Sequence, residues 1–326
     1  MLIVMENRAT PAQITAVSQA IVALGLEAHE MPGAQRTAIC VTGNDGSVSA
    51  RHFADLSGIR EIICVSKPYK LSSNEVKSEK TIIAIGSELL GGAKPILIAG
   101  PLCVEQEAVT LKIAEGIKQA GISCFRAACF KARTNPYNFQ GIGKPGLKIL
   151  EKIKNDFNLN IITEVVDQES LDYCEDLADG LIIESHNMQN FALLKSLGKS
   201  KKPVILKRSI SANLEDWLMS AEYILSSGND QVILCESGIR TFANYSAHTL
   251  DLTVILALKN LTHLPIIIDP SFASGDHRYV IPLAKAGLAV GADGVMLECH
   301  SEPSKALGGG AQAISLAGLE SLKNII

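Results

Sequence analysis

Short apolar runs recur at even spacing from Lys94 onward, and they limit the fold more than any other feature of the sequence. Each run is apolar throughout, which is typical of parallel strands buried on both faces, and an amphipathic stretch follows it. The stretch from Asn213 to Ser227 places apolar residues at three- and four-residue steps and ends at Gly228. The expected strands are Pro95–Gly100, Cys124–Phe130, Ile161–Val166, Gly180–Ser185, Pro203–Arg208, Gln231–Glu236, Pro265–Pro270 and Gly294–Cys299. Eight such βα units in about 230 residues predict an α/β fold, a (β/α)8 TIM barrel, over residues 94–326.

An open, doubly wound parallel sheet is the alternative arrangement of these elements, and a glycine-rich dinucleotide motif after the first strand would favour it. The chain has a literal G-x-G-x-x-G at Gly141–Gly146, but this stretch follows a long polar loop and contains Pro145. We interpret it as a chance match and prefer the barrel.

Residues 1–67 show a different pattern, in which strand and helix signals alternate over short distances. The expected elements are a strand at Leu2–Met5, a helix at Pro11–Leu24, strands at Glu27–Met31 and Thr37–Val41, a helix at Ser49–Leu56 and a strand at Ile59–Val65. This βαββαβ order predicts a small ferredoxin-like α+β domain in front of the barrel. Residues 68–93 are more polar and contain Gly-Gly near their end, so we expect a linker with one or two short strands.

Charge and cysteine content exclude several classes of protein. Acidic residues outnumber basic ones by 34 to 30, so the chain lacks the overall positive field that nucleic acid or an anionic membrane attracts. The eight cysteines form no C-x-x-C pair and mostly lie in apolar runs, which predicts buried, reduced thiols and a cytoplasmic location. The N-terminal MLIVMENRAT indicates a strand, not a signal peptide, and no apolar run approaches the roughly 18 residues of a membrane-spanning helix. We therefore expect no nucleic-acid partner and no membrane partner.

Polar side chains gather where the expected strands end, which in a TIM barrel is the face that carries function. The basic ones are Arg126, Lys131, Arg133, Lys207 and Arg240. The others at these ends are Glu164, Glu184, His186, Glu236, Asp269, Glu298 and His300. Any one base could form a salt bridge at the rim, but five that converge on one barrel mouth predict a local anion pocket. The residues thus predict an enzyme-like pocket for a phosphorylated or carboxylated small molecule.

Longer motifs at the same positions give the sequence a family resemblance. It resembles the 3-deoxy-D-arabino-heptulosonate 7-phosphate (DAHP) synthases, in the short form that has a ferredoxin-like N-terminal domain. The matching segments are KPYKL at Lys67–Leu71, AGP at Ala99–Pro101, KARTNPYNFQG at Lys131–Gly141, NMQNF at Asn187–Phe191, LKR at Leu206–Arg208, SAEYI at Ser220–Ile224, ILCESGIRTF at Ile233–Phe242, DPS at Asp269–Ser271 and EPSKAL at Glu302–Leu307. They span nearly the whole chain, and several are long and specific.

The resemblance implies an aldol-type condensation of phosphoenolpyruvate with erythrose 4-phosphate and loss of inorganic phosphate, in the shikimate pathway or in secondary metabolism. It also implies roles for single residues. Phosphoenolpyruvate would be held by Arg126, Lys131, Lys207 and Arg240, and the sugar phosphate by Arg133 and Thr134. Glu164 and Asp269 complete the expected substrate-binding set. Members of the family are commonly oligomeric, so we expect a homo-oligomer.

The chain departs from the family at the metal site, where a divalent ion polarises the aldehyde. The family's ligands are a Cys, a His, a Glu and an Asp. Leu102 stands at the Cys position, Phe272 at the His position and Gly309 at the Asp position, while Glu298 is retained. Because one carboxylate cannot form a closed site for a divalent ion, we expect no cofactor. A metal could bind only through a rearranged site, built from Glu298 with Cys103, Cys129, Cys299 or His300.

Other changes lie near the same place. The family has an arginine in G-A-R-N, where this chain has Glu184-Ser185-His186-Asn187, so a fixed positive charge is lost and a carboxylate is gained. A family Gly-Gly pair is Ala127-Ala128, which narrows the pocket if the backbone is unchanged. Most of the anion-binding bases are nevertheless present, which favours a changed reaction or substrate on the same scaffold.

Three interpretations stay open. The first is a metal-independent member of the family that acts on phosphoenolpyruvate or a related phosphorylated or carboxylated molecule, with Lys131, His186 and Glu298 as catalytic acid–base groups. Lys131 is attractive because neighbouring cations could lower its pKa. The second is a DAHP synthase with a displaced metal site. The third is a non-catalytic ligand-binding or regulatory protein that keeps the anion pocket.

Overall fold

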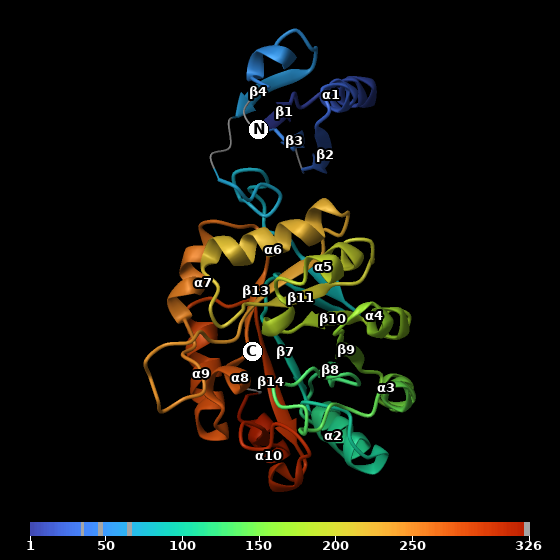
Figure 1. Cartoon of the computed structure of the whole chain (residues 1–326), viewed down its shortest axis with the longest axis vertical. Coiled ribbons are helices and arrows are strands. Elements are labelled where there is room, and N and C mark those ends of the chain that lie inside the picture. Colours follow the sequence, from blue (N-terminus) through green and yellow to red (C-terminus); the bar gives the residue numbers. More distant parts are fainter. Residues whose placement is uncertain (34–35, 45–47, 64–66, 323–326) are drawn as a thin grey trace. The chain divides into compact units, whose positions relative to one another are not determined.

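The computed structural model describes residues 1–33, 36–44, 48–63 and 67–322 of the chain. These residues separate into two compact units, one of residues 1–80 with 260–263 and one of residues 81–259 with 264–322 (Figure 1). The domain boundaries expected from the sequence, 1–67, 68–93 and 94–326, stay predictions. Among the described residues, no helix is both long and apolar enough to cross a membrane.

The second unit is a closed barrel of parallel strands surrounded by helices (Figure 1). The strands of the described barrel are β7 (Ile96–Gly100), β8 (Cys124–Arg126), β9 (Asn160–Glu164), β10 (Gly180–Ile183), β11 (Val204–Lys207), β12 (Val232–Glu236), β13 (Ile266–Ile268) and β14 (Gly294–His300). Each pairs in parallel with the next, and β14 pairs with both β13 and β7, which closes the ring. The predicted TIM barrel is confirmed, and each strand lies within or close to its expected range.

Helices follow the strands and cover the outside of the barrel. They are α2 (Glu107–Gln119), α3 (Lys144–Phe157), α4 (Gln168–Cys174), α5 (Phe191–Leu197), α6 (Leu214–Ser226), α7 (Leu252–Lys259), α8 (Pro270–Ser274), α9 (His277–Ala289) and α10 (Leu316–Glu320). In α6, the Asn213 side chain accepts from the Asp216 amide, and the Asp216 side chain accepts from the Asn213 amide. Such reciprocal caps satisfy amides that the helix leaves free. Trp217 is buried on the inner face of α6 and donates to the Leu206 carbonyl of β11, which fixes the helix against the barrel.

A hairpin closes the amino-terminal end of the barrel. Its strands, β5 (Ile83–Ile85) and β6 (Glu88–Leu90), pair antiparallel within the segment predicted as a linker with short strands. Ile83, Ile85 and Leu90 belong to the same apolar core as the inward-facing residues of the barrel strands. The Ser123 hydroxyl, just before β8, donates to the Glu88 carboxylate at 2.6 Å. Apolar side chains of the hairpin therefore fill the amino-terminal end of the barrel, and the polar side chains lie at the carboxyl end of the strands.

The first unit is an antiparallel α+β domain, as expected. Its elements are β1 (Leu2–Met5), α1 (Pro11–Ala23), β2 (Glu27–Pro32), β3 (Thr37–Thr42), η1 (Ala50–Phe53) and β4 (Ile59–Ile63). The sheet order is β2-β3-β1-β4, with α1 contributing Val17 and Ile21 to the core beneath it. Thr10 and Gln13 form a capping box that starts α1, and Pro11 at its first position fits the fixed φ of proline.

The helix predicted at Ser49–Leu56 is wrong in type and length. The structure has a single 3₁₀ turn, η1, at Ala50–Phe53. The His52 ring accepts a hydrogen bond from the Ser49 amide at 3.2 Å. The turn therefore satisfies this amide by itself, without further helical turns. In this turn Phe53 is the fully buried residue, so there is little apolar surface to stabilise further turns. The end of the last predicted strand, residues 64–65, lies outside the described residues.

Candidate active site

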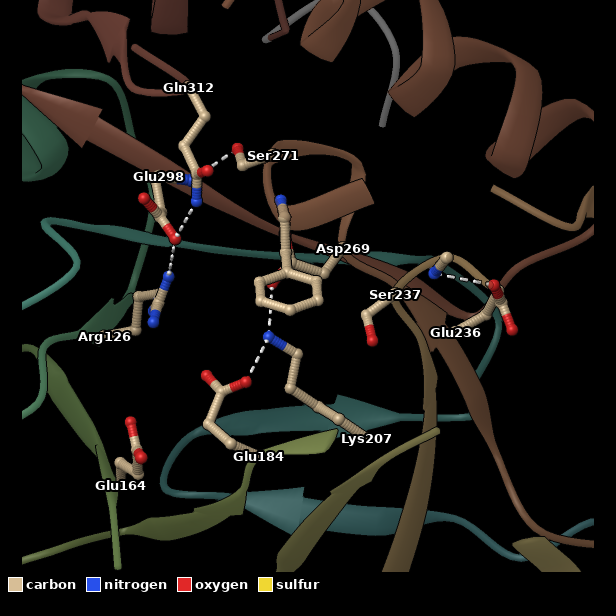
Figure 2. A network of polar contacts seen from close by, with 12 residues as sticks. Arg126, Glu164, Glu184, Lys207, Glu236, Ser237, Asp269, Ser271, Glu298 and Gln312 are labelled. Atoms are coloured by element: carbon tan, nitrogen blue, oxygen red, sulfur yellow. Dashed lines mark hydrogen bonds and ion pairs between the residues drawn. The ribbon is translucent and has the colours of Figure 1, made fainter. Parts of the chain in front are cut away.

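A buried network of charges lies at the carboxyl ends of the barrel strands (Figure 2). We call it the charge cluster, and define it as Arg126, Lys131, Glu164, Glu184, Lys207, Asp269 and Glu298. All of these side chains are buried. The sequence predicts each of them at or just after a strand end, and the structure joins them in two sets of ion pairs, one around Lys131 and Lys207 and one between Arg126 and Glu298.

Lys207, at the end of β11, is the best-enclosed cation of the cluster. Its ammonium lies 2.8 Å from Asp269 Oδ2 and 2.9 Å from Glu184 Oε2, and the side chain is 1% exposed. Figure 2 shows the lysine pointing between these two carboxylates. Burial alone would lower the pKa of Lys207, but Asp269 and Glu184 outweigh it and raise that pKa. Lys207 is therefore a fixed positive charge.

The sequence around Asp269 explains how a phenyl ring comes to lie beside Lys207. Asp269 Oδ1 accepts from the Phe272 amide at 3.0 Å and so caps α8, in which Pro270 takes the first position. This tight turn places the Phe272 ring 4.6 Å from Lys207 Nζ and 5.2 Å from the His248 ring. One aspartate thus holds both the lysine and the backbone that carries the ring.

Lys131 comes from the loop after β8 and joins two carboxylates. Its ammonium lies 2.6 Å from Glu164 Oε2 and 2.9 Å from Glu184 Oε1. The expectation that neighbouring cations lower the pKa of Lys131 is wrong. Burial and the cations Lys207 and Arg126 do act in that direction, but the two carboxylates at hydrogen-bond distance outweigh them and raise its pKa. Lys131 therefore stays protonated and can act as a hydrogen-bond donor or acid.

The two carboxylates on Lys131 differ in their affinity for a proton. Burial raises the pKa of Glu164 to about 7, because the single cation that contacts it does not offset its desolvation. Glu184 is equally buried, but Lys131, Lys207 and Arg126 hold its pKa well below the usual value. A proton on this pair therefore resides on Glu164, and Glu184 stays ionised.

Arg126 and Glu298 form the other part of the cluster. Arg126 Nη1 lies 3.2 Å from Glu298 Oε1, which also accepts from Gln312 Nε2 at 2.8 Å. Figure 2 shows both groups meeting at that oxygen. Arg126 Nε and Glu298 Oε2 have no hydrogen-bond partner among the described residues. Burial raises the pKa of Glu298, although Arg126 acts in the opposite direction.

A cavity of about 500 Å³ opens above the cluster. Its lining includes Lys131, Arg133, Thr134, Glu184, Ser185, His186, Ser209, Arg240, His248 and Phe272. Lys131 and Glu184 are its buried charged residues, and we call them the floor. Arg240 is exposed and Arg133 is partly exposed, and we call these two residues the mouth. Within the described residues, neither mouth arginine forms an ion pair, in contrast to the paired bases of the cluster. The backbone fixes the place of Arg240, whose amide donates to the Ile210 carbonyl at 2.8 Å.

Five of the predicted site residues therefore line one pocket: Lys131, Arg133, Thr134, His186 and Arg240. The others, Arg126, Glu164, Lys207, Asp269 and Glu298, lie in the cluster and do not line the cavity. Partial burial lowers the pKa of His186, so this imidazole is neutral near pH 7. The catalytic and binding roles of all these residues stay predictions.

Reasoning from the sequence missed several residues of the site, among them His248 and Gln312. His248 lies in the loop between β12 and α7, and Gln312 in the segment between β14 and α10. Neither stands at a strand end, so the pattern that marks the other residues gives no signal for them. The backbone amides of Ile239 and Thr249 each donate to the carbonyl of the other residue at 2.9 Å. These two hydrogen bonds close the loop that brings His248 next to Phe272.

Leu102 and Gly309 lie next to the free oxygen of Glu298. A Cβ atom added to Gly309 would meet Glu298 Oε2 and would lie 3.1 Å from Leu102 Cβ, so these residues converge on one place. Leu102 itself is buried and packs with Cys103, Ala128 and Phe139. Burial raises the pKa of the Cys103 thiol to about 12. In the described part of the chain, no group of three or more His, Cys, Asp or Glu side chains could hold a metal ion.

Comparison with known proteins gives consistent matches along the chain. The DAHP synthetase I family matches residues 74–326, and the DAHP synthase ferredoxin-like domain matches residues 1–67. A phospho-2-dehydro-3-deoxyheptonate aldolase of Thermotoga maritima is 38% identical over 314 residues, which cover 96% of this chain and 93% of that protein. A 2-dehydro-3-deoxyphosphooctonate aldolase of Desulfatibacillum aliphaticivorans is 34% identical over 249 residues, 71% of this chain and 90% of that protein.

Solved structures agree with these matches. The crystal structure of a DAHP synthase from Thermotoga maritima superposes with a TM-score of 0.78 at 36% identity, covering 99% of this chain and 95% of that one. A truncated form of the Thermotoga maritima 3-deoxy-D-arabino-heptulosonate 7-phosphate synthase superposes with a TM-score of 0.73 and covers 78% of this chain and 94% of that one. The likeness therefore extends over both units.

Proposed function

The chain belongs to the DAHP synthetase I family, and from that premise we propose that it is an aldol-type enzyme that works without a divalent metal. Its substrate is phosphoenolpyruvate or a related phosphorylated or carboxylated small molecule. The relatives named above are aldolases of phosphorylated 3-deoxy sugar acids, which supports the reaction class. We also propose a homo-oligomer, which sedimentation velocity would test.

One observation carries this proposal. Lys131 is a buried ammonium that lines the cavity and is fixed by Glu164 and Glu184. A protonated amine with two fixed carboxylate partners is oriented before any ligand arrives, so little reorganisation is needed when negative charge develops on a bound oxygen. The mouth arginines supply attraction for an anionic group on the same ligand.

The donor atoms near Glu298 do not fit a divalent metal. Leu102 and Gly309 stand beside its free oxygen, and neither side chain can donate an electron pair. The Phe272 ring lies over Lys207 and offers no donor atom, and among the described residues no group of three or more His, Cys, Asp or Glu side chains could hold a metal ion. We therefore derive no step through a metal.

In the proposed reaction, the residues of this chain polarise the carbonyl and move protons. As the enol carbon of one substrate attacks the carbonyl carbon of the other, the carbonyl oxygen gains negative charge. Lys131 donates a hydrogen bond and then a proton to that oxygen. Glu164, whose pKa is about 7, is 2.6 Å away and returns a proton to Lys131. When the attacking substrate is an enol phosphate, water adds to the carbon left electron-poor, phosphate leaves, and the proton that this water loses restores Glu164. Arg126 and Lys207 keep the cluster's carboxylates in place from below.

The test measures phosphate release from phosphoenolpyruvate with erythrose 4-phosphate, with and without EDTA. Release that EDTA does not change supports the proposal, and release that EDTA abolishes supports a metal-dependent DAHP synthase. If no phosphate is released, the protein is next assayed for condensation of 2-oxo acids with aldose phosphates. Lys131→Ala abolishes whichever activity is found, and full activity in that variant would refute the role of Lys131. Absence of every activity, with ligand binding intact, would indicate a binding protein.

A further inference from the structure

Glu184 occupies the place that an anionic ligand group would be expected to take. Its oxygens lie 2.9 Å from Lys131 Nζ and 2.9 Å from Lys207 Nζ, so one carboxylate bridges the two lysines. Two ammonium groups at this spacing, buried at the end of a barrel, form a site for a phosphate or carboxylate group. In this chain that site is filled by a side chain of the protein.

The ion pairs below the pocket also argue against a second anion at the floor. In the charge cluster each cation already has a carboxylate partner, because Lys131 and Lys207 share Glu184, Lys207 also pairs with Asp269, and Arg126 pairs with Glu298. A second anion at the floor would have to displace Glu184 and leave a buried carboxylate without a partner. Unpaired buried charges are strongly unfavourable. Ionised Glu184 would also repel an anion that came to lie beside it.

The mouth of the pocket has the opposite character. Arg133 and Arg240 line the cavity, and within the described residues neither has a carboxylate partner. Arg133 Nε is buried and has no hydrogen-bond acceptor among those residues. The hydroxyl group of Thr134 also lines the cavity. This end of the pocket therefore offers unused donors to a single anionic group.

We propose that Glu184 is a built-in anion that determines specificity: the pocket takes a ligand with one anionic group, bound at the mouth, and an uncharged carbonyl or hydroxyl end at the floor. This inference rests on the proposed function and narrows its substrate class. It disfavours phosphoenolpyruvate, which carries a phosphate and a carboxylate, and it favours a monophosphorylated sugar or a simple 2-oxo acid.

Binding measurements test the inference without any need for turnover. Isothermal titration calorimetry on the full chain uses inorganic phosphate, pyruvate and phosphoenolpyruvate as probes. We expect the wild type to bind one equivalent of phosphate or pyruvate and to bind phosphoenolpyruvate no more tightly. Arg240→Ala weakens phosphate binding by about tenfold or more, because it removes half of the arginine pair. Tight binding of phosphoenolpyruvate by the wild type, unaffected by Arg240→Ala, would overturn the proposal.

Replacing Glu184 gives the sharper measurement. Glu184→Gln keeps the size of the side chain and one acceptor oxygen, but it removes the charge. We expect a second equivalent of phosphate and a gain of about tenfold or more in affinity for phosphoenolpyruvate. Glu236→Gln is the matched control, because Glu236 is also buried at a strand end but pairs with Arg208 outside the cavity, and it leaves the affinity unchanged.

The outcomes separate this inference from the proposed function. If Glu184→Gln weakens phosphoenolpyruvate binding or leaves it unchanged, Glu184 does not exclude the second anion and the inference is wrong, whatever the activity assays show. If Glu184→Gln does not fold, the wild-type and Arg240→Ala titrations still decide between one anion and two. A protein that binds one anion but catalyses nothing contradicts the proposed function and leaves the inference standing.

Discussion

Removing the charge of Lys207 should destabilise the barrel more than removing any exposed lysine charge. In Lys207→Met the 0%-exposed Asp269 loses the cation 2.8 Å from its Oδ2, while Glu184 keeps Lys131. Loss of one partner from a buried ion pair costs about 3–5 kcal/mol. For a unit of this size, each kcal/mol lowers the melting temperature by about 2–4 °C, so we expect a decrease of roughly 10 °C, measured by circular dichroism at pH 8.

Lys152→Met is the matched control, because Lys152 forms an exposed ion pair with Glu107 on the barrel surface. Exposed pairs contribute little, so we expect no measurable change in its melting temperature. If the melting temperature of Lys207→Met were the same as that of Lys152→Met, Lys207 would not be the buried cation on which this part of the cluster depends.

Three further predictions concern the neighbouring groups. Gly309→Ala should cost about 1–3 kcal/mol, because the new Cβ would meet Glu298 Oε2 at a residue with φ of 72°. Gly121→Ala is the control for backbone strain, because Gly121 has a φ of 76° and nothing lies within 4 Å of a Cβ placed there. In urea unfolding, Gly121→Ala should lower the free energy of unfolding by less than Gly309→Ala does. The raised pKa of Glu164 stabilises the folded protein at low pH, and this stabilisation is lost as pH rises through about 7. Glu164→Gln should lack this pH-dependent contribution, so its melting temperature should fall less than that of the wild type over this pH range. Equal pH profiles of the two melting temperatures would contradict this. Protein purified without chelator should contain no stoichiometric divalent metal by elemental analysis, and a stoichiometric ion whose removal lowers the melting temperature would overturn the metal-free proposal.

The fold could be predicted closely because its signal is local. Runs such as residues 96–100 and 232–235 are apolar throughout, as is typical of short parallel strands buried on both faces. The prediction of a helix at Ser49–Leu56 was wrong because the local signal there is ambiguous. A bond between the His52 ring and the Ser49 amide is possible in a turn as well as in a helix, and residue pattern does not distinguish them.

The sequence predicted which charged side chains lie at one end of the barrel, but not which of them form ion pairs with one another. Strand ends identify which charged side chains meet, because all parallel strands end on one face. They do not say which carboxylate neutralises which base. The pKa of Lys131 was expected to fall because bases are its neighbours in the sequence pattern, but in space its contacts are Glu164 and Glu184. The same limit applies to Glu184, whose bridging of the two lysines depends on side-chain positions on three different segments.

The hairpin formed by β5 and β6 has a kinetic consequence. Because Ile83, Ile85 and Leu90 fill the amino-terminal end of the barrel, that end offers no second route to the cavity. Substrates and products share one entrance. A ligand whose anionic group binds Arg133 and Arg240 while its uncharged end reaches Lys131 spans the cavity from mouth to floor, so a co-substrate that reacts at the floor must arrive before it and leave after it. Steady-state kinetics of this protein should show a compulsory order of addition, with the outer ligand acting as a dead-end inhibitor when it binds first.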